Sequence, residues 1–185
     1  MLKDILIRTV EQRILSMFVA NPDKVFYSRE VSKKIKISLG ATSNALRLLK
    51  KNNVLTSEKK GKTNPYTLKL PNEYLERFKI LNTLLTLESL VEKLKNISRC
   101  TILYGSYAAG TFTSDSDLDL FIISEKRDEV LKAIANFKGK TAFEIKPVIK
   151  KQVEWMQLEK SNLEFFGEVN RGIVLWEKPI NESGF

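Results

Sequence analysis

The spacing of apolar residues along the first seventy positions predicts helices alternating with short strands. Between Thr9 and Ala20, apolar residues recur three or four positions apart, as on one face of a helix, and Asn21-Pro22 ends the pattern. Ser28 is a good N-cap residue for the next helix, and Ser38-Leu39-Gly40 is expected to form the turn after it. The predicted helices lie at residues 9–20, 28–36 and about 41–52, and the predicted strands at residues 25–27, 54–58 and 66–70.

The third of these helices has one apolar and one polar face. Ala45, Leu46 and Leu49 are expected to face inward. The polar face is expected to present Thr42, Ser43, Asn44, Arg47, Lys50 and Lys51. Between the last two strands lies a charged loop that contains Lys59, Lys60 and Lys62. A polar helix face beside a lysine-rich hairpin is the composition of a nucleic-acid-binding surface.

The second part of the chain predicts a long helix and then a small α/β domain. The long helix, capped by Asn72, is apolar over more than one narrow stripe, which favours either packing inside the monomer or contact with a second subunit in a homodimer. Further strands are expected at residues 101–104, 117–123, 141–149 and 172–176, and further helices at residues 125–137, 151–158 and 162–169. We therefore expect an α+β protein with domains at residues 1–70 and 97–185, joined by a helix at 71–96.

Charge is divided unevenly between these parts. Residues 1–70 hold 15 Lys+Arg against 5 Asp+Glu, whereas residues 71–185 hold 16 against 17, within a net charge of +9. A positive excess confined to one module favours a polyanion partner for that module. The chain has no histidine and one cysteine, which excludes an internal disulfide, a zinc finger and a histidine-dependent triad. No apolar run is long enough for a membrane span, so we expect a cytoplasmic protein without a membrane partner.

Residues 8–70 resemble the winged helix-turn-helix family of bacterial and archaeal regulators. The tracts that carry the resemblance are Tyr27 to Val31, Ala41 to Leu49 and Asn53-Val54-Leu55. It implies binding of double-stranded DNA, with Arg47 at base edges and Lys59, Lys60 and Lys62 on the phosphate backbone. The other polar residues of the third helix, Thr42, Ser43, Asn44, Lys50 and Lys51, would lie on the DNA. Winged helices also serve as protein-protein modules, and the sequence leaves that alternative open.

A second motif lies between Leu103 and Leu120. Gly105 allows a sharp turn after a buried strand, and Ser106 then opens a helical turn whose N–H groups and hydroxyl suit phosphate. Asp117 and Asp119 are two positions apart on a strand, so they project from one face about 6 to 7 Å apart. Two carboxylates placed in this way can share Mg²⁺.

This motif resembles the signature of the DNA polymerase beta superfamily of nucleotidyltransferases. Gly105, Ser106, Gly110 and Ser116 fall on its nucleotide-binding positions, and Asp117 and Asp119 on its metal-binding, catalytic positions. The resemblance implies Mg²⁺-dependent transfer of a nucleotidyl group, expected to be adenylyl from ATP, to an acceptor such as a protein. The winged-helix and nucleotidyltransferase resemblances together cover most of the chain.

Two departures from that signature keep a second function open. The family's third carboxylate corresponds to Glu144, which would complete the metal and catalytic set, but aspartate is usual there. Ala109 stands where many members carry arginine. The alternative is therefore a winged-helix transcriptional regulator, or an antitoxin-like protein, whose second domain is inactive or only senses nucleotide.

Overall fold

The computed structural model describes residues 2–58, 64–137 and 143–179. The chain divides into two compact units. The N-terminal unit comprises Met1–Leu85 and Phe112–Ser114, and the C-terminal unit comprises Thr86–Thr111 and Asp115–Phe185. Helix α5, Glu73–Leu94, contributes its first half to the former and its second half to the latter. In the described part of the chain, no helix combines the length and apolar character that a membrane span requires.

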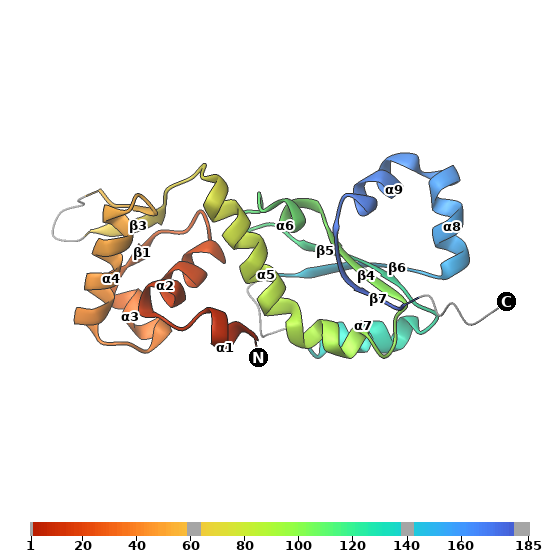
Figure 1. Cartoon of the computed structure of the whole chain (residues 1–185), viewed down its shortest axis with the longest axis horizontal. Coiled ribbons are helices and arrows are strands. Elements are labelled where there is room, and N and C mark those ends of the chain that lie inside the picture. The colour runs from red at the N-terminus through yellow and green to blue at the C-terminus, as the bar shows by residue number, and fades with distance from the viewer. Residues whose placement is uncertain (1, 59–63, 138–142, 180–185) are drawn as a thin grey trace. The chain divides into compact units, whose positions relative to one another are not determined.

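The N-terminal unit is a winged helix. Its helices are α1 (Leu2–Leu6), α2 (Val10–Val19), α3 (Ser28–Ile35) and α4 (Leu39–Lys51), and its strands are β1 (Phe26–Tyr27), β2 (Leu55–Thr56) and β3 (Pro65–Leu68). The strands form an antiparallel sheet in the order β1-β3-β2. Figure 1 shows α3 and α4 (orange) next to this sheet. The predicted order of helices and strands is confirmed.

Helix α1 was not predicted, because none of its residues is buried and an apolar periodicity is therefore lacking. By contrast, α2 has a strong local signal at its start. The Thr9 hydroxyl accepts a hydrogen bond from the Gln12 backbone N–H at 3.2 Å, and the Gln12 side chain accepts from Thr9 N at 3.0 Å. This reciprocal capping box satisfies two N–H groups that a helix start otherwise leaves unpaired.

The start of α4 corrects the predicted turn. The Ser38 hydroxyl accepts from Ala41 N at 3.3 Å, so Ser38 caps the helix, and Leu39 and Gly40 are helical instead of forming a turn. The change of direction occurs earlier, at Lys36, whose backbone adopts the left-handed conformation with φ 53°. An N-cap serine and a turn serine look alike in sequence, because the same hydroxyl serves both.

Thr42 is a second correction. It is fully buried, whereas we expected it on the outer face of α4. Thr42 precedes Ala45, Leu46 and Leu49 by three, four and seven positions, so it lies on the same helix face, and these three residues are buried as predicted. Thr42 is therefore a core residue and is removed from the candidate DNA-contacting set.

Thr42→Val is expected to stabilise the protein by about 1 kcal/mol, because a buried hydroxyl without a partner costs free energy that a methyl group does not. The Thr42 hydroxyl has no hydrogen-bond partner among the described residues. Urea unfolding measures the change, and Thr42→Ala, which leaves a cavity, is the control expected to destabilise. Lower stability of the valine variant, or loss of DNA affinity, would show that the hydroxyl has a partner.

Residues 112–114, which lie between the two halves of the second motif, are held within the N-terminal unit. Lys79 of α5 is 2% exposed, and its Nζ donates to the Phe112 carbonyl at 2.6 Å and lies 4.2 Å from the centre of the Phe112 ring. Burial lowers the pKa of Lys79. Asp23 accepts from Ser114 N at 2.7 Å. Residues 112–114 are therefore fixed by side chains from α5 and from the loop after α2.

The C-terminal unit is a four-stranded mixed sheet with helices on both sides. Its strands are β4 (Cys100–Tyr104), β5 (Leu118–Ile123), β6 (Ile145–Lys150) and β7 (Ile173–Glu177), and its helices are α6 (Gly105–Ala109), α7 (Arg127–Ala135), α8 (Gln152–Ser161) and α9 (Leu163–Asn170). The sheet order is β6-β5-β4-β7, with β5 and β6 parallel and the other pairs antiparallel. The predicted short mixed sheet is confirmed, and Pro147 lies on an edge strand, where a missing N–H is tolerated.

Aromatic residues fill the space between this sheet and α8 and α9. Phe121 packs against Trp155 and Phe165 with ring centres 4.8 and 6.1 Å apart, and Trp155 contacts Phe166 at 4.8 Å. Phe121 is fully buried, and the other three aromatic side chains are partly buried against the same core. Figure 1 shows α7 on the opposite side of the sheet from α8 and α9.

Candidate functional site

The turn from β4 into α6 brings one acid against the backbone of a glycine. Gly105 has φ +68°, a conformation that side chains rarely adopt. A Cβ atom at Gly105 would lie 2.7 Å from Oδ2 of Asp119, so the absence of a side chain leaves room for the carboxylate. In the antiparallel pair of β4 and β5, Tyr104 lies opposite Asp119. The register and the glycine together place Asp119 at the start of α6.

Asp119 lies on β5 and Asp117 lies just before it, instead of on the strand as expected, so both acids are at this end of the sheet. Burial raises the pKa of Asp119, and the negative charges of Asp117 and then Glu168 raise it further. The pKa rises because a partly buried carboxylate beside two like charges is destabilised in its ionised form. An arrangement that gathers three negative charges is suited to a bound cation.

Lys146 is the cation that the structure places next to this pair. Its Nζ lies 3.2 Å from Asp117 Oδ2, and in the parallel pair of β5 and β6 it lies opposite Asp119. The two side chains of the ion pair are 57% and 42% exposed, so water competes for both charges and the pair contributes little to stability. The hydrogen bond to Asp117 raises the pKa of Lys146. Lys146 therefore stays charged and neutralises part of the negative charge of Asp117.

Glu144 lies just before β6, and its backbone carbonyl accepts from Leu118 N at 2.8 Å. This contact aligns Glu144 with the start of β5, but its side chain is exposed. Within residues 2–58, 64–137 and 143–179, no group of three acids, cysteines or histidines is placed to hold a metal ion. The structure thus brings Asp117 and Asp119 together, and a third metal ligand at Glu144 stays a prediction.

The remaining motif residues shape the turn around the acids. Gly110 ends α6 in the left-handed conformation, with φ 77°, and its N–H donates to the Ser106 carbonyl. Ser106, which we expected to hold phosphate, is half-buried at the first turn of α6. The Tyr107 hydroxyl donates to the Ser116 carbonyl at 3.5 Å, and burial together with Asp117 raises the pKa of Tyr107 to about 12.

Glu168 and Lys146 are site residues that the sequence did not identify. Glu168 lies on α9, about fifty positions after the motif, and its charge raises the pKa values of Asp119 and Tyr104. No local pattern marks it, because only the packing of α9 onto β4 and β5 brings it there. Lys146 had a sequence signal, since it lies two positions after Glu144 in the predicted strand at residues 141–149.

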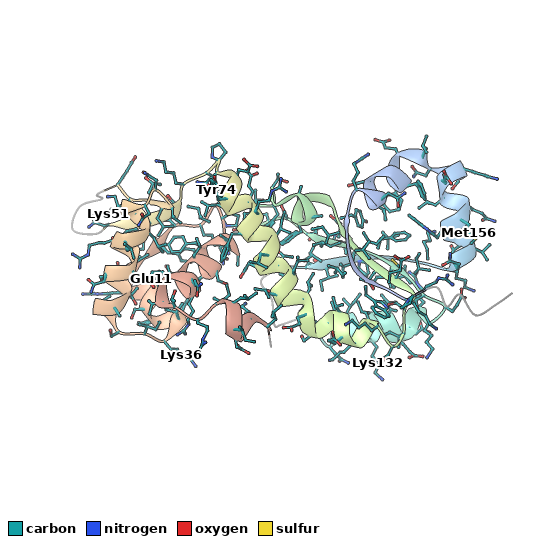
Figure 2. The ribbon with its side chains drawn as sticks, viewed as in Figure 1. Glu11, Lys36, Lys51, Tyr74, Lys132 and Met156 are labelled. Carbon is teal, nitrogen blue, oxygen red and sulfur yellow. The ribbon has the colours of Figure 1, made fainter. Side chains whose placement is uncertain are left out.

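A second candidate surface lies on α4 of the N-terminal unit. Asn44, Arg47, Lys50 and Lys51 are exposed and Ser43 is half-buried, in agreement with the predicted polar face. Figure 2 shows Lys51 at the end of this helix. The predicted backbone contacts at Lys59, Lys60 and Lys62 lie outside the described residues.

This surface is concave next to Arg47. A pocket of about 610 Å³ is lined by Ser43 and Arg47, and also by residues that were not predicted to contact DNA: Tyr27, Ser28, Arg29, Leu39, Asn64 and Tyr66. Arg47 donates to Asn44 Oδ1 and, at 3.4 Å, to the Ser43 carbonyl. Two predicted contact residues therefore hold the guanidinium in place.

Two of the solved structures that match this chain have low similarity to it. Reduced HlyU from Vibrio cholerae N16961 is 23% identical with a TM-score of 0.32, and the match covers 42% of this chain and 75% of HlyU. TrmBL2, an archaeal chromatin protein whose structure is titled as showing a novel mode of DNA binding, is 17% identical with a TM-score of 0.31, over 87% of this chain and 69% of TrmBL2. At these values neither likeness bears on function. Comparison with curated proteins gave no match.

A family described as Polymerase beta, Nucleotidyltransferase matches residues 86–181. The matched range contains Gly105, Ser106, Asp117 and Asp119, the residues that the structure gathers at one end of the sheet. It spans just over half of the chain. The chain therefore belongs to the Polymerase beta nucleotidyltransferase family.

Proposed function

We propose that the protein binds double-stranded DNA through its winged helix and transfers a nucleotidyl group from a nucleoside triphosphate to an acceptor hydroxyl. The observation that carries the transferase half is the fit of the Asp119 carboxylate against Gly105, with Asp117 beside it. This geometry requires a glycine at the turn and two acids at the start of β5. ATP is the nucleotide to test first, and a protein is the acceptor class to test first.

The donor set suits Mg²⁺, which prefers carboxylate oxygens and retains several water ligands. When bound, Mg²⁺ would neutralise charge on the triphosphate and on the leaving pyrophosphate. Asp117 and Asp119 would hold it, and Lys146 would have to release Asp117 first. Without a cation the ionised Asp119 carboxylate is destabilised, because it is partly buried and close to the negative charges of Asp117 and Glu168.

The remaining steps belong to the side chains around the acids. Ser106 binds a phosphate oxygen of the triphosphate. The acceptor oxygen forms a bond to the α-phosphorus while the bond from the α-phosphorus to the bridging oxygen breaks, and pyrophosphate leaves. We assign the proton lost by the acceptor to Glu144, which is aligned with the start of β5 through its backbone contact to Leu118.

The transferase is tested with triphosphates labelled at the α-phosphate, Mg²⁺ and a cell extract as the source of acceptor. The matched control is the Asp117→Asn, Asp119→Asn double variant, which keeps side-chain volume and removes both charges. Transfer of label by the wild-type chain and its loss in the control support the proposal. Equal labelling with both chains, or none with either across all four triphosphates, contradicts it.

The DNA-binding half is supported by charge and by shape. The first seventy residues carry the positive excess of the chain, and the exposed cations Arg47, Lys50 and Lys51 line one side of α4. A helix of this kind fits the major groove, where arginine can bind guanine through two hydrogen bonds. Each lysine that neutralises a phosphate releases counterions, so the affinity is expected to fall with salt.

Arg47→Gln is expected to weaken binding to a cognate duplex by about ten- to a hundredfold, since a bidentate base contact contributes ~1–3 kcal/mol. Binding to unrelated duplexes is expected to weaken much less. Lys24→Gln, which removes the same charge outside α4, is the control. Fluorescence anisotropy at several salt concentrations measures both effects. If the two variants lose affinity equally on every duplex, Arg47 contributes charge only and the recognition role assigned to it is wrong.

The ion pair between Lys146 and Asp117 favours a second function. A lysine that neutralises one metal-binding acid is what a domain that no longer turns over nucleotide would retain. In that case the protein is a winged-helix regulator, or an antitoxin-like protein, in which the C-terminal unit only senses nucleotide. The exposure of this ion pair favours the transferase over the regulator, because an exposed lysine can move away from Asp117 at little cost in free energy.

Lys146→Gln separates the two functions. If the protein is a transferase, the change is expected to lower the Mg²⁺ concentration needed for half-maximal transfer by about two- to fivefold, because Mg²⁺ no longer has to displace a lysine from Asp117. Lys150→Gln is a matched control, since Lys150 lies on the same strand and pairs with Glu154 at 3.3 Å. Transfer assays across a Mg²⁺ series measure the shift. Absence of transfer by both the wild type and Lys146→Gln at every Mg²⁺ concentration would favour the regulator.

A further inference from the structure

The C-terminal unit has a basic pocket at the end of the sheet farthest from the two acids. It lies where β4 begins and where β5 and β7 end, since Cys100 pairs with Ile123 and Glu177. Asp119 lies opposite Tyr104, at the other end of β4. Four residue steps along a strand separate the two ends by roughly 13 Å. Figure 1 shows α6 and the start of α8 at opposite ends of this sheet.

The charge of the pocket differs from the charge of its unit. The C-terminal unit contains 14 Lys+Arg and 15 Asp+Glu, so it has no positive excess. The pocket is nevertheless lined by Lys95, Arg99, Lys126 and Lys178 against a single acid, Glu125. Glu125 itself lies 3.9 Å from Lys151. Positive charge is therefore concentrated here, just as negative charge is concentrated around Asp117 and Asp119.

Two of these cations have acid partners and two do not. Lys95 pairs with Glu92 at 2.5 Å, and Lys126 pairs with Glu129 at 3.3 Å. Within the described parts of the chain, Arg99 and Lys178 form no ion pair. The backbone holds them side by side, because Lys178 N donates to the Arg99 carbonyl at 2.8 Å. A guanidinium and an ammonium on adjacent chain segments, without a carboxylate between them, suit a phosphate group.

Two further residues of the pocket suit a ligand that carries a ring and a hydrogen-bond donor in addition to a phosphate. Trp176 supplies an indole ring, which Lys95 Nζ contacts at 5.5 Å from the ring centre. Gln152, the first residue of α8, has a buried side-chain oxygen that no donor in the described residues reaches. A buried acceptor without a partner costs free energy until a ligand donates to it. A sugar hydroxyl or a base amino group is such a donor, and an indole offers a surface for a ring.

We propose that this pocket binds a nucleoside phosphate, with the phosphate on Arg99 and Lys178 and the nucleoside between Trp176 and Gln152. Its volume of about 810 Å³ lies in the range of small-molecule sites. This second site is separate from the acid pair. It does not depend on nucleotidyl transfer, because none of its residues belongs to the motif that contains Asp117 and Asp119.

The test measures binding of ADP to the full chain by calorimetry, with EDTA present so that no divalent cation supports binding at the acids. Arg99→Gln, Lys178→Gln is expected to weaken ADP binding at least about tenfold, since each removed cation deletes a charge-assisted hydrogen bond. The control is Lys132→Gln, Lys160→Gln, which removes the same charge from exposed positions on α7 and α8 and is expected to change affinity less than about twofold. Figure 2 labels Lys132 on α7.

Further arms identify the ligand. ADP is expected to bind more tightly than inorganic phosphate. Gln152→Met is expected to weaken ADP binding and to leave phosphate binding unchanged, so that the two affinities become more similar. The Asp117→Asn, Asp119→Asn variant is expected to bind ADP as the wild type does, which separates this site from the transferase. If the double variant at Arg99 and Lys178 folds poorly by its melting curve, Lys178→Gln alone replaces it, because that side chain is exposed.

The proposal is overturned by any of four results. ADP fails to bind at millimolar concentration, or both charge-removing pairs weaken it equally. Inorganic phosphate binds as tightly as ADP. Finally, a single-stranded oligonucleotide or an acidic peptide binds through Arg99 and Lys178 more tightly than ADP does, which would assign the pocket to a macromolecule.

Discussion

Asp119→Asn is expected to reduce nucleotidyl transfer by ~10³-fold or more, because it removes one of two charges placed to hold the metal ions that stabilise the transition state. The same change is expected to leave the fold intact or to make it slightly more stable. Burial and the neighbouring charges of Asp117 and Glu168 raise the pKa of Asp119, so its ionised form lowers stability at neutral pH. Asparagine has the same size and carries no charge.

The pH dependence follows from that raised pKa. A carboxyl group whose pKa is higher in the folded state than in the unfolded state destabilises the fold above the folded pKa, and this penalty disappears as the pH falls through it. The stability advantage of Asp119→Asn is therefore expected at neutral pH and is expected to vanish in acid. Melting curves from neutral pH to below pH 4, in EDTA, measure it.

Addition of Mg²⁺ provides a readout that does not need the acceptor. A ligand that binds only the folded state raises the melting temperature, so Mg²⁺ with ATP is expected to stabilise the wild type and not Asp119→Asn. Glu164→Gln on α9 is a control that removes an exposed acid from the same unit. If Asp119→Asn retains transfer within about tenfold of the wild type, the metal site assigned to the two acids is wrong.

Much of the site was predictable because its signals are local. Gly105 and Gly110 each adopt a left-handed conformation, and Asp117 and Asp119 are separated by one residue at the start of β5. Such features depend on a few neighbouring residues, so one sequence is enough to identify them. The mixed sheet was also predictable, because its apolar segments are short, β-branched and separated by turn residues.

The rest of the site depends on packing between distant segments. Glu168 reaches Asp119 only because α9 lies on β4 and β5, and the apolar pattern of α9 contains no information about that neighbour. The pairing of Lys146 with Asp117 depends on the register of β5 and β6, which residue spacing within either strand leaves open. Thr42 was misplaced for a different reason: its polar side chain suggested the outer face, although its spacing from Ala45, Leu46 and Leu49 places it on the buried face.

Gly105→Ala is expected to reduce nucleotidyl transfer by ~10²-fold, because it displaces the Asp119 carboxylate and leaves its charge and chemistry unchanged. The added Cβ would lie 2.7 Å from Asp119 Oδ2, so the carboxylate must move away from the start of α6. The left-handed backbone, with φ +68°, adds a penalty of ~1–2 kcal/mol for any residue with a Cβ. Gly40→Ala is the matched control, because it lies within α4 with nothing within 4 Å of the added atom, and alanine favours a helix.

A double-mutant cycle separates the two penalties at Gly105. In an Asp119→Ala background the carboxylate is gone, so Gly105→Ala should cost only the backbone penalty, and urea unfolding should show a smaller loss of stability than in the wild-type background. The difference between the two losses measures the contact between the glycine turn and the acid. If the losses are equal, the carboxylate does not rest against Gly105, and the geometry on which the transferase proposal depends is absent. If they differ while Gly105→Ala keeps full transfer, the contact exists but Asp119 does not hold the catalytic metal ion.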